Sequence, residues 1–349
     1  MNYREFLRRI PKAELHVHLV GAVRSGTLVE LARKRALTLP RGEDELYRYR
    51  SFYDFIDVLR LTARALVDAD DFARVVYEYA ETAKRSGNLR HLELFFNPSY
   101  HYPQRVSYRT QVDGLVAGAR AARADFGVSC LLIPSADRGF GPQAARQMID
   151  DVLAYRRDEV VGIGLDGPED QGPPGLFAET FGLAARAGLK RTAHVCEDYA
   201  ATPAGNYAIC RDVLGCERLD HGYRLLLDDA IAGRAKSEGV YFTCCPKPST
   251  RERDEARLNA IAQMVGSGLN ISLATDDPLM FETDIGDCYQ RVFIAFGWGP
   301  GRARQIALAG VEASWLDAGA KQALRRDFER EISALIVQLD PASVPASRH

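Results

Sequence analysis

The sequence contains no long hydrophobic run, little net charge and no recognisable cysteine pattern. No apolar stretch approaches the ~18 residues of a membrane span, and residues 1–9 lack the apolar segment of a signal peptide. The 45 basic and 47 acidic residues are interspersed, which argues against binding to nucleic acid or anionic lipid. The seven cysteines include no Cys-x-x-Cys pair, so neither a disulfide framework nor a structural zinc knuckle is indicated. We therefore expect a cytoplasmic protein that binds no nucleic acid and no membrane.

What the sequence does contain is the composition of an ordinary globular protein. Hydrophobic residues make up 46% and charged residues 26% of the chain, close to the usual values. Its 349 residues suit either two average domains or one (β/α)8 barrel with insertions. Because no linker or composition shift divides the chain, we predict one barrel domain over residues 1–339 and a flexible tail over 340–349.

Short apolar runs alternate with longer helical patterns, as in βα units around a parallel sheet. The eight predicted strands lie at 14–19, 90–96, 128–133, 160–165, 190–195, 217–221, 239–244 and 269–274. Helical patterns lie between them, for example at 111–125, 143–157 and 174–187. Eight is the strand number of a TIM barrel, so the predicted fold class is α/β with a single (β/α)8 barrel.

The interval between the first two predicted strands is much longer than a barrel needs. Within it, residues 51–59 have apolar side chains at helical spacing. We expect this helix to lie over the barrel mouth as a lid, with Phe52 and Phe55 against the substrate. The alternative is an extra helix packed on the outside of the barrel. Two or three further helices are expected after the last strand.

Four of the seven histidines fall at the ends of predicted strands, where a barrel builds its active site. His16 and His18 are separated by one residue, so both side chains face the barrel axis. Such a pair alone is equally compatible with two buried core imidazoles. His194 and His221 end two further strands, and a third histidine would bring the set closer to a zinc site.

The Asp276-Asp277 pair follows the eighth predicted strand. Before Pro278, such a pair by itself more often caps a helix or forms a turn. At the end of the same barrel as the histidines, however, one of its carboxylates would complete a nitrogen and oxygen ligand set with a position left for water.

Several short segments together resemble one known family. They are Pro11 to Leu19 with Gly21, Gly164 to Glu169, His194 with Glu197, Asp220 to Gly222, Cys245-Pro246 and Thr275 to Pro278. The sequence thereby resembles the adenosine deaminase family of the amidohydrolase superfamily, in the family's order from residue 11 to 278.

The resemblance implies a ligand set for one Zn²⁺ and its water, made up of His16, His18, His194 and Asp276. It further implies that His221 orients the water, while Glu197 protonates N1 of a purine ring. Glu197 would have to stay protonated, as desolvation in a dry pocket would achieve.

For recognition, the resemblance implies that Asp277 bonds purine N7 and that the backbone N–H of Gly167 contacts N3. The products would be ammonia and a 6-oxo purine.

Two other zinc hydrolases fit the sequence less well. The cytidine-type deaminases need a Pro-Cys-x-x-Cys motif, which is missing. A binuclear barrel hydrolase would need a bridging lysine at a strand end, but Lys190 lies four residues before His194, a full barrel layer too low.

The substrate is less clearly indicated than the reaction. Adenosine deaminases usually carry an aspartate for the ribose 5'-hydroxyl, and adenine deaminases a glutamate, where this chain has Val20. We expect a small purine nucleoside as substrate, with conversion of adenosine to inosine as the default. The alternatives are a 5'-modified adenosine such as aminodeoxyfutalosine, or adenine. More remote alternatives are a zinc amidohydrolase of cyclic amides and a non-catalytic purine-binding protein.

Overall fold

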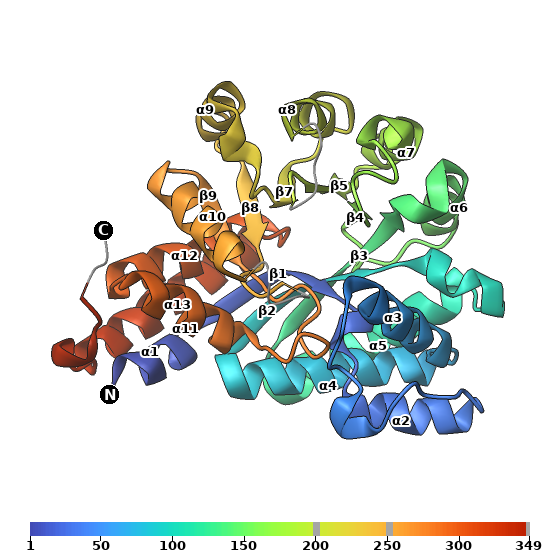
Figure 1. The fold of residues 1–349 in the computed structure, drawn as a ribbon, viewed down its shortest axis with the longest axis horizontal. Coiled ribbons are helices and arrows are strands. Elements are labelled where there is room, and N and C mark those ends of the chain that lie inside the picture. The colour runs from blue at the N-terminus through green and yellow to red at the C-terminus, as the bar shows by residue number, and fades with distance from the viewer. Residues whose placement is uncertain (198–202, 249–253, 347–349) are drawn as a thin grey trace.

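The computed structural model describes residues 1–197, 203–248 and 254–346, without the side chains of Phe52 and Pro203. Parallel strands occupy the centre and helices surround them (Figure 1). The strands are β1 (Lys12–His18), β2 (Leu89–Phe96), β3 (Ser129–Asp137), β4 (Gly162–Asp166), β5 (Lys190–Arg191), β6 (His194–Val195), β7 (Arg218–His221), β8 (Tyr241–Cys244) and β9 (Asn270–Leu273). The α/β barrel predicted from the sequence is confirmed, and every predicted strand has a counterpart.

The barrel ladder is not closed by regular strand pairing. It consists of two parallel sheets, β1 to β5 and β6 to β9, because the predicted strand at 190–195 is divided in two. Single backbone bonds cross this gap: Thr192 donates to Ile163 over 3.1 Å, and Asp220 donates to Ala193 over 2.9 Å. At the other gap, the amide of His18 donates to the carbonyl of Asp276 over 2.8 Å. Both interruptions fall beside predicted metal ligands.

Helix α1 precedes β1, and the helices that follow it connect the strands. They are α1 (Tyr3–Arg9), α2 (Ser25–Lys34), α3 (Phe52–Ala65), α4 (Ala69–Gly87), α5 (Tyr108–Phe126), α6 (Gly141–Ala154), α7 (Ala178–Arg186), α8 (Pro203–Ala208), α9 (Asp229–Ser237) and α10 (Asp254–Gly266). Capping residues fix several ends: Ser51 caps α3 through Asp54 N, and Gly127 ends α5 with φ +66°. The long interval after β1 thus holds three helices.

Three helices follow the last strand: α11 (Ile285–Phe296), α12 (Pro300–Ala313) and α13 (Ala318–Val337). Helix α12 packs against both β9 and β1 and so covers the gap between the first and last strands. The segment that follows α13 returns to the N-terminus, where Asp340 N donates to Met1 O over 2.9 Å (Figure 1). Residues Pro341–Ser343 form a 3-10 turn, while 347–349 lie outside the described residues. The flexibility of the tail stays a prediction.

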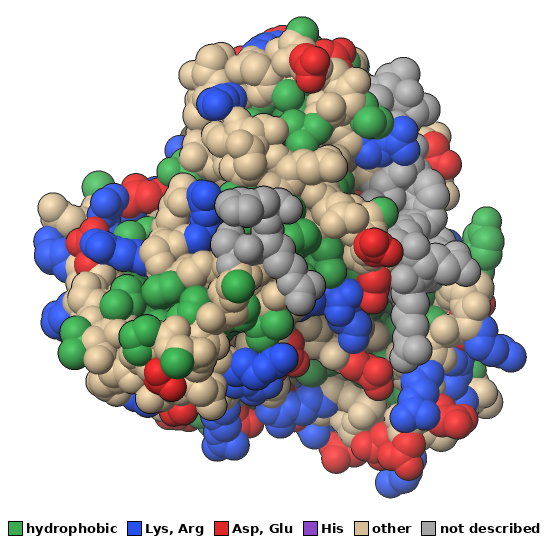
Figure 2. All heavy atoms as spheres, turned by 60° about the vertical axis from the view of Figure 1, so that its left-hand side comes forward, with side chains coloured by type: hydrophobic (Ala, Val, Ile, Leu, Met, Phe, Trp, Pro, Cys, Tyr) green, Lys and Arg blue, Asp and Glu red, His purple; other side chains and the backbone are tan. Residues whose placement is uncertain are grey.

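The described surface, helices and cysteines have three features that relate to the exclusions made from the sequence. Figure 2 shows basic and acidic side chains intermixed over one face of the molecule. Among the described residues, no helix is both long and apolar enough to cross a membrane. All seven cysteines are buried, and none of them forms a disulfide bond.

Candidate active site

A cavity opens where the strands end, with an empty volume of about 960 Å³ that includes its mouth. Most of the site residues predicted from the sequence line it: His18, Val20, Phe55, Gly167, His194, Glu197, His221, Asp276 and Asp277. His16 is fully buried behind its wall. The side chain of Phe52, also predicted to contact the substrate, lies outside the described residues.

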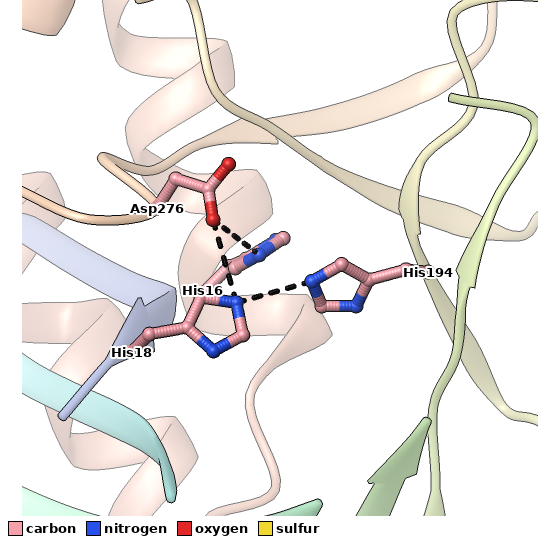
Figure 3. Close-up of side chains that lie close together, drawn as sticks. All are labelled: His16, His18, His194 and Asp276. Atoms are coloured by element: carbon pink, nitrogen blue, oxygen red, sulfur yellow. Dashed lines mark hydrogen bonds and ion pairs between the residues drawn. The ribbon is translucent and has the colours of Figure 1, made fainter. Parts of the chain in front are cut away.

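Three imidazoles and one carboxylate converge at the buried end of this cavity (Figure 3). One ligand atom from each of His16, His18, His194 and Asp276 lies within 4.8 Å of the others. Asp276 Oδ1 is 3.4 Å from Nε2 of both His16 and His18, and the Nε2 atoms of His18 and His194 are 3.1 Å apart. The four residues come from three separate strand ends, as predicted.

Asp220 orients two of these rings from the side away from the cavity. Its carboxylate lies 3.3 Å from His194 Nδ1 and accepts a 2.7 Å bond from the hydroxyl of Thr243. Thr243 Oγ1 in turn lies 2.9 Å from His16 Nδ1. Because Thr243 donates its proton to Asp220, His16 donates from Nδ1 to Thr243, and the His16 Nε2 lone pair faces the cluster, where it has no hydrogen-bond partner among the described residues. Convergent lone pairs beside a carboxylate form a fitting site for a divalent cation.

The electrostatics of the cluster suit the same interpretation. Burial lowers the pKa of His18 to about 3 and also lowers that of His194, which keeps both rings neutral, the form that binds metal. Burial alone would lower the pKa of His16 too, but Asp276 and Asp220 raise it overall. A cation would therefore replace a proton there.

The backbone is strained at two of the strand ends. His221 has φ +68° and Asp276 has φ +71°, a left-handed conformation that non-glycine residues rarely adopt. Such strain is often found at functional sites, where the surrounding structure fixes it. These turns direct both side chains toward the cluster. One possible ligand atom from each of Glu197, His221 and Asp276 lies within 4.8 Å of the other two.

Glu197 lies at the rim of the cluster and is paired with an arginine. Its Oε1 accepts a 2.9 Å bond from Arg257, and its Oε2 is 3.7 Å from His221 Nε2. Glu169 accepts a 2.9 Å bond from the amide of Glu197 and so fixes its backbone. The side chain of Glu197 is 32% exposed, and Arg257 is the counter-ion of its carboxylate. The protonated state that the resemblance implies stays a prediction.

Asp277 lies beside the cluster and is packed against Gly21. A Cβ at Gly21 would come within 2.1 Å of Asp277 Oδ1, so only glycine allows this approach. Burial, with the charges of Asp276 and Asp166 nearby, raises the pKa of Asp277 well above its usual value. Its Oδ1 has no hydrogen-bond partner within the described parts of the chain.

A second set of residues lines the cavity, and we call it the base-edge wall. It consists of Asn97, Tyr100, Asp137, Asp166 and Gly167. Asn97 Nδ2 lies 2.9 Å from both carboxylate oxygens of Asp166. The hydroxyl of Tyr100 donates to Asp137 over 2.6 Å. Asp166 Oδ2 also lies 3.7 Å from His18 Nδ1, so this wall adjoins the metal cluster.

Arg138 connects this wall to the metal cluster. Its buried guanidinium donates to three carbonyl groups, those of Gly167 at 3.1 Å, Gly172 at 3.0 Å and His194 at 2.8 Å. One side chain therefore fixes both the loop after β4 and the strand that carries a predicted metal ligand.

The comparisons with known proteins agree with this geometry. The family model described as adenosine deaminase matches residues 11–330. The chain belongs to the adenosine deaminase family. It is 31% identical over 349 residues to an adenine deaminase of Cupriavidus taiwanensis, with 98% of each chain covered.

Two solved structures of this kind are similar throughout. An amidohydrolase from Burkholderia ambifaria, solved with bound zinc, matches with a TM-score of 0.89 and 33% identity, over 96% of this chain and 94% of that one. The adenine deaminase of Arthrobacter aurescens matches with a TM-score of 0.86 and 29% identity, over 94% and 99%.

In this member of the adenosine deaminase family, α3 contributes Phe55, Ile56 and Leu59 to the cavity. The helix thus lies at the mouth, as expected for the segment at 51–59. Whether it opens and closes as a lid stays a prediction. Lys190 is exposed and lies 3.4 Å from Glu217, well placed for a surface ion pair and away from the cluster.

The sequence-based reasoning missed several residues of the cavity and its supports. They are Tyr100, Asp137, Arg138, Glu169, Arg257 and, as the carboxylate behind the histidines, Asp220. Asp220 and Glu169 had an available signal, since both stand within the family segments. The others stand at the end of β3, in turns or in a helix, with no characteristic spacing.

Proposed function

We propose that this chain is a zinc-dependent hydrolase that removes the 6-amino group of a purine, and that its principal substrate is the free base adenine. The observation that carries the proposal is the convergence of three imidazoles and a carboxylate beside Glu197, His221 and Asp277 in one cavity. Metal, proton donor and ring-binding groups are the parts that hydrolytic deamination needs.

The metal would be held by His16, His18, His194 and Asp276. Neutral nitrogen ligands with one carboxylate suit zinc, and the zinc in the Burkholderia ambifaria amidohydrolase supports this choice. When bound, zinc would lower the pKa of a water molecule to about 7 and so supply a nucleophile at neutral pH.

The side chains around the cluster would then divide the remaining work. His221, held at φ +68°, would orient the attacking water and stabilise the charge that develops. Glu197 would deliver a proton to N1, which makes C6 electrophilic and allows ammonia to leave. Because a carboxylate paired with Arg257 has no proton to deliver, we propose that Glu197 takes up a proton from solvent as the purine enters, excludes water and breaks the arginine contact.

Two groups would bind the purine ring at its other nitrogens. N7 is an acceptor, so Asp277 must donate to it, and its buried position beside Asp276 favours the protonated form that can do so. The backbone N–H of Gly167 would donate to N3.

Adenine is favoured over adenosine by two observations. The relatives that match over 98% of the chain are named adenine deaminases. Val20 is buried at the cavity wall and offers no acceptor for a ribose 5'-hydroxyl, which counts against adenosine, although it also replaces the glutamate usual in adenine deaminases. The same valine also favours a second candidate, a 5'-modified adenosine that has no free hydroxyl there.

Ammonia release from a panel of purines tests the proposal. The zinc-loaded enzyme is given adenine, adenosine, 5'-methylthioadenosine and aminodeoxyfutalosine, with Glu197→Gln as the inactive control. We expect the highest kcat/KM with adenine. Release from none of the four would overturn purine deamination, and a higher kcat/KM with a nucleoside would overturn the choice of adenine alone.

A further inference from the structure

Asp137 and Gly167 lie side by side on the base-edge wall. Asp137 ends β3 and pairs in register with Asp166, the last residue of β4, which Gly167 follows. A Cβ built on Gly167 would lie 2.7 Å from Asp137 Oδ1, and Gly167 has φ +82°. No side chain therefore separates the Gly167 backbone from the Asp137 carboxylate, and both line the cavity.

The Asp137 carboxylate retains acceptor capacity toward the cavity. Its Oδ1 accepts from the amide of Gly139 over 2.7 Å, and its Oδ2 accepts from the Tyr100 hydroxyl over 2.6 Å. A carboxylate has about four acceptor positions, so each oxygen can accept one more bond. Tyr100 itself remains a donor, because burial and the charges of Asp137 and Asp166 raise its pKa well above 10.

Asp137 lies beside the group proposed to bind N3. Gly167 would meet N3 and Asp277 would meet N7, and N9 is the nitrogen between N3 and N7 around the purine ring. Because the Asp137 carboxylate adjoins Gly167 and lines the same cavity as Asp277, a purine bound in this way would turn its N9 side toward Asp137.

A free purine base presents an acceptor and a donor along this edge, N3 and N9–H. The wall presents the complementary pair, an amide N–H at Gly167 and a carboxylate at Asp137. In a nucleoside, N9 carries the sugar and has no proton to donate. The Asp137 carboxylate would then be removed from water without gaining a hydrogen bond, which costs binding free energy.

We propose that Asp137 determines specificity for free purine bases by accepting a hydrogen bond from N9–H. This inference rests on the proposed function, since it assumes a purine in the cavity. A purely structural alternative exists, because Asp137 also caps the turn at Gly139, and the test must separate the two roles.

The test compares adenine with 9-methyladenine, which keeps N1, N3, N7 and the 6-amino group but lacks the N9 proton. In Asp137→Asn, the side-chain oxygen can still cap the turn, since asparagine caps as well as aspartate. The matched control is Asp228→Asn, because Asp228 caps α9 through Ala230 N and Ile231 N outside the cavity.

We expect Asp137→Asn to lower kcat/KM for adenine by roughly 10- to 100-fold, mostly through KM, as the loss of a charged hydrogen bond would. Activity with 9-methyladenine, already low in the parent enzyme, should be almost unchanged by Asp137→Asn. Asp228→Asn should alter neither activity.

Three results would overturn the inference while leaving purine deamination intact. They are equal activity of the parent enzyme on both bases, an equal loss of both activities in Asp137→Asn, and no loss of adenine activity in that variant. An enzyme inactive on every purine in the panel would instead overturn the proposed function itself.

Discussion

The two ends of the cavity are built differently. At the metal end, the proposed ligands stand in short motifs at strand ends, and Asp220 contacts His194 directly and His16 through Thr243 from behind. At the base-edge wall, Asp137, Tyr100 and Gly167 come from separate segments with no shared motif. This difference indicates that the residues for the reaction and the residues for substrate choice come from different parts of the chain. The same metal-binding residues can therefore serve enzymes with different substrates.

The largest expected effect comes from removing a ligand at the metal end. We expect Asp276→Ala to lose its bound zinc and to lower kcat/KM by about 10³-fold or more, since the ion contributes several kcal/mol. Zinc content by mass spectrometry and ammonia release measure both effects. Asp158→Ala, at an exposed position, is the control. Retention of zinc with full activity in Asp276→Ala would contradict the ligand assignment.

The next effect separates the proton donor from the metal. Glu197→Gln removes the acidic proton but keeps the shape, so we expect a loss of about 10²- to 10⁴-fold in kcat. Zinc content should stay at the parent value, because Glu197 is not among the proposed ligands. Full activity of this variant would remove Glu197 from the mechanism and favour hydrolysis of a ring amide, where no N1 needs a proton.

A smaller loss of zinc affinity is expected when the residues that support the proposed histidine ligands are changed. Asp220→Asn weakens the support of His194 and, through Thr243, of His16. We expect a loss of about 10- to 100-fold in zinc affinity, measured by competition with a chelator, while KM for adenine at saturating zinc changes little. Thr243→Val, which disrupts the His16 branch, should give a weaker loss of the same kind. Unchanged zinc affinity in both variants would show that the support is unnecessary.

The smallest effect is expected at the wall near Val20. Val20→Thr keeps the side-chain shape and adds one hydroxyl. If that hydroxyl meets a ribose 5'-hydroxyl, kcat/KM for adenosine should rise about 3- to 10-fold, the worth of one neutral hydrogen bond. The value for adenine should stay the same. An equal change for both substrates would show that Val20 does not face the sugar position.

Much of the fold could be predicted because buried parallel strands are short apolar runs bounded by turns. The strand predicted at 190–195 was found in two parts, since backbone pairing near His194 depends on both neighbouring strands. The metal set was predictable because strand geometry places His16 and His18 on one face. Arg138 and Asp137 were not, because their roles arise from distant segments that only the folded chain brings together.

The environment of Glu197 was also beyond prediction. The family resemblance implied a proton donor at Glu197, but the guanidinium beside it comes from α10, 60 residues further along the chain. Charge pairs of this kind depend on tertiary packing, so the sequence pattern could not show that the resting carboxyl has a counter-ion.

The three bonds of Arg138 have a thermodynamic consequence. Because this guanidinium holds the carbonyls of both Gly167 and His194, a base that shifts the Gly167 loop also shifts the strand carrying a metal ligand. Coupling between two binding events is reciprocal: the factor by which zinc strengthens the binding of a base must equal the factor by which the base strengthens the retention of zinc. If the coupling is favourable, the enzyme should therefore bind its metal more tightly at equilibrium when a base is bound than when the cavity is empty.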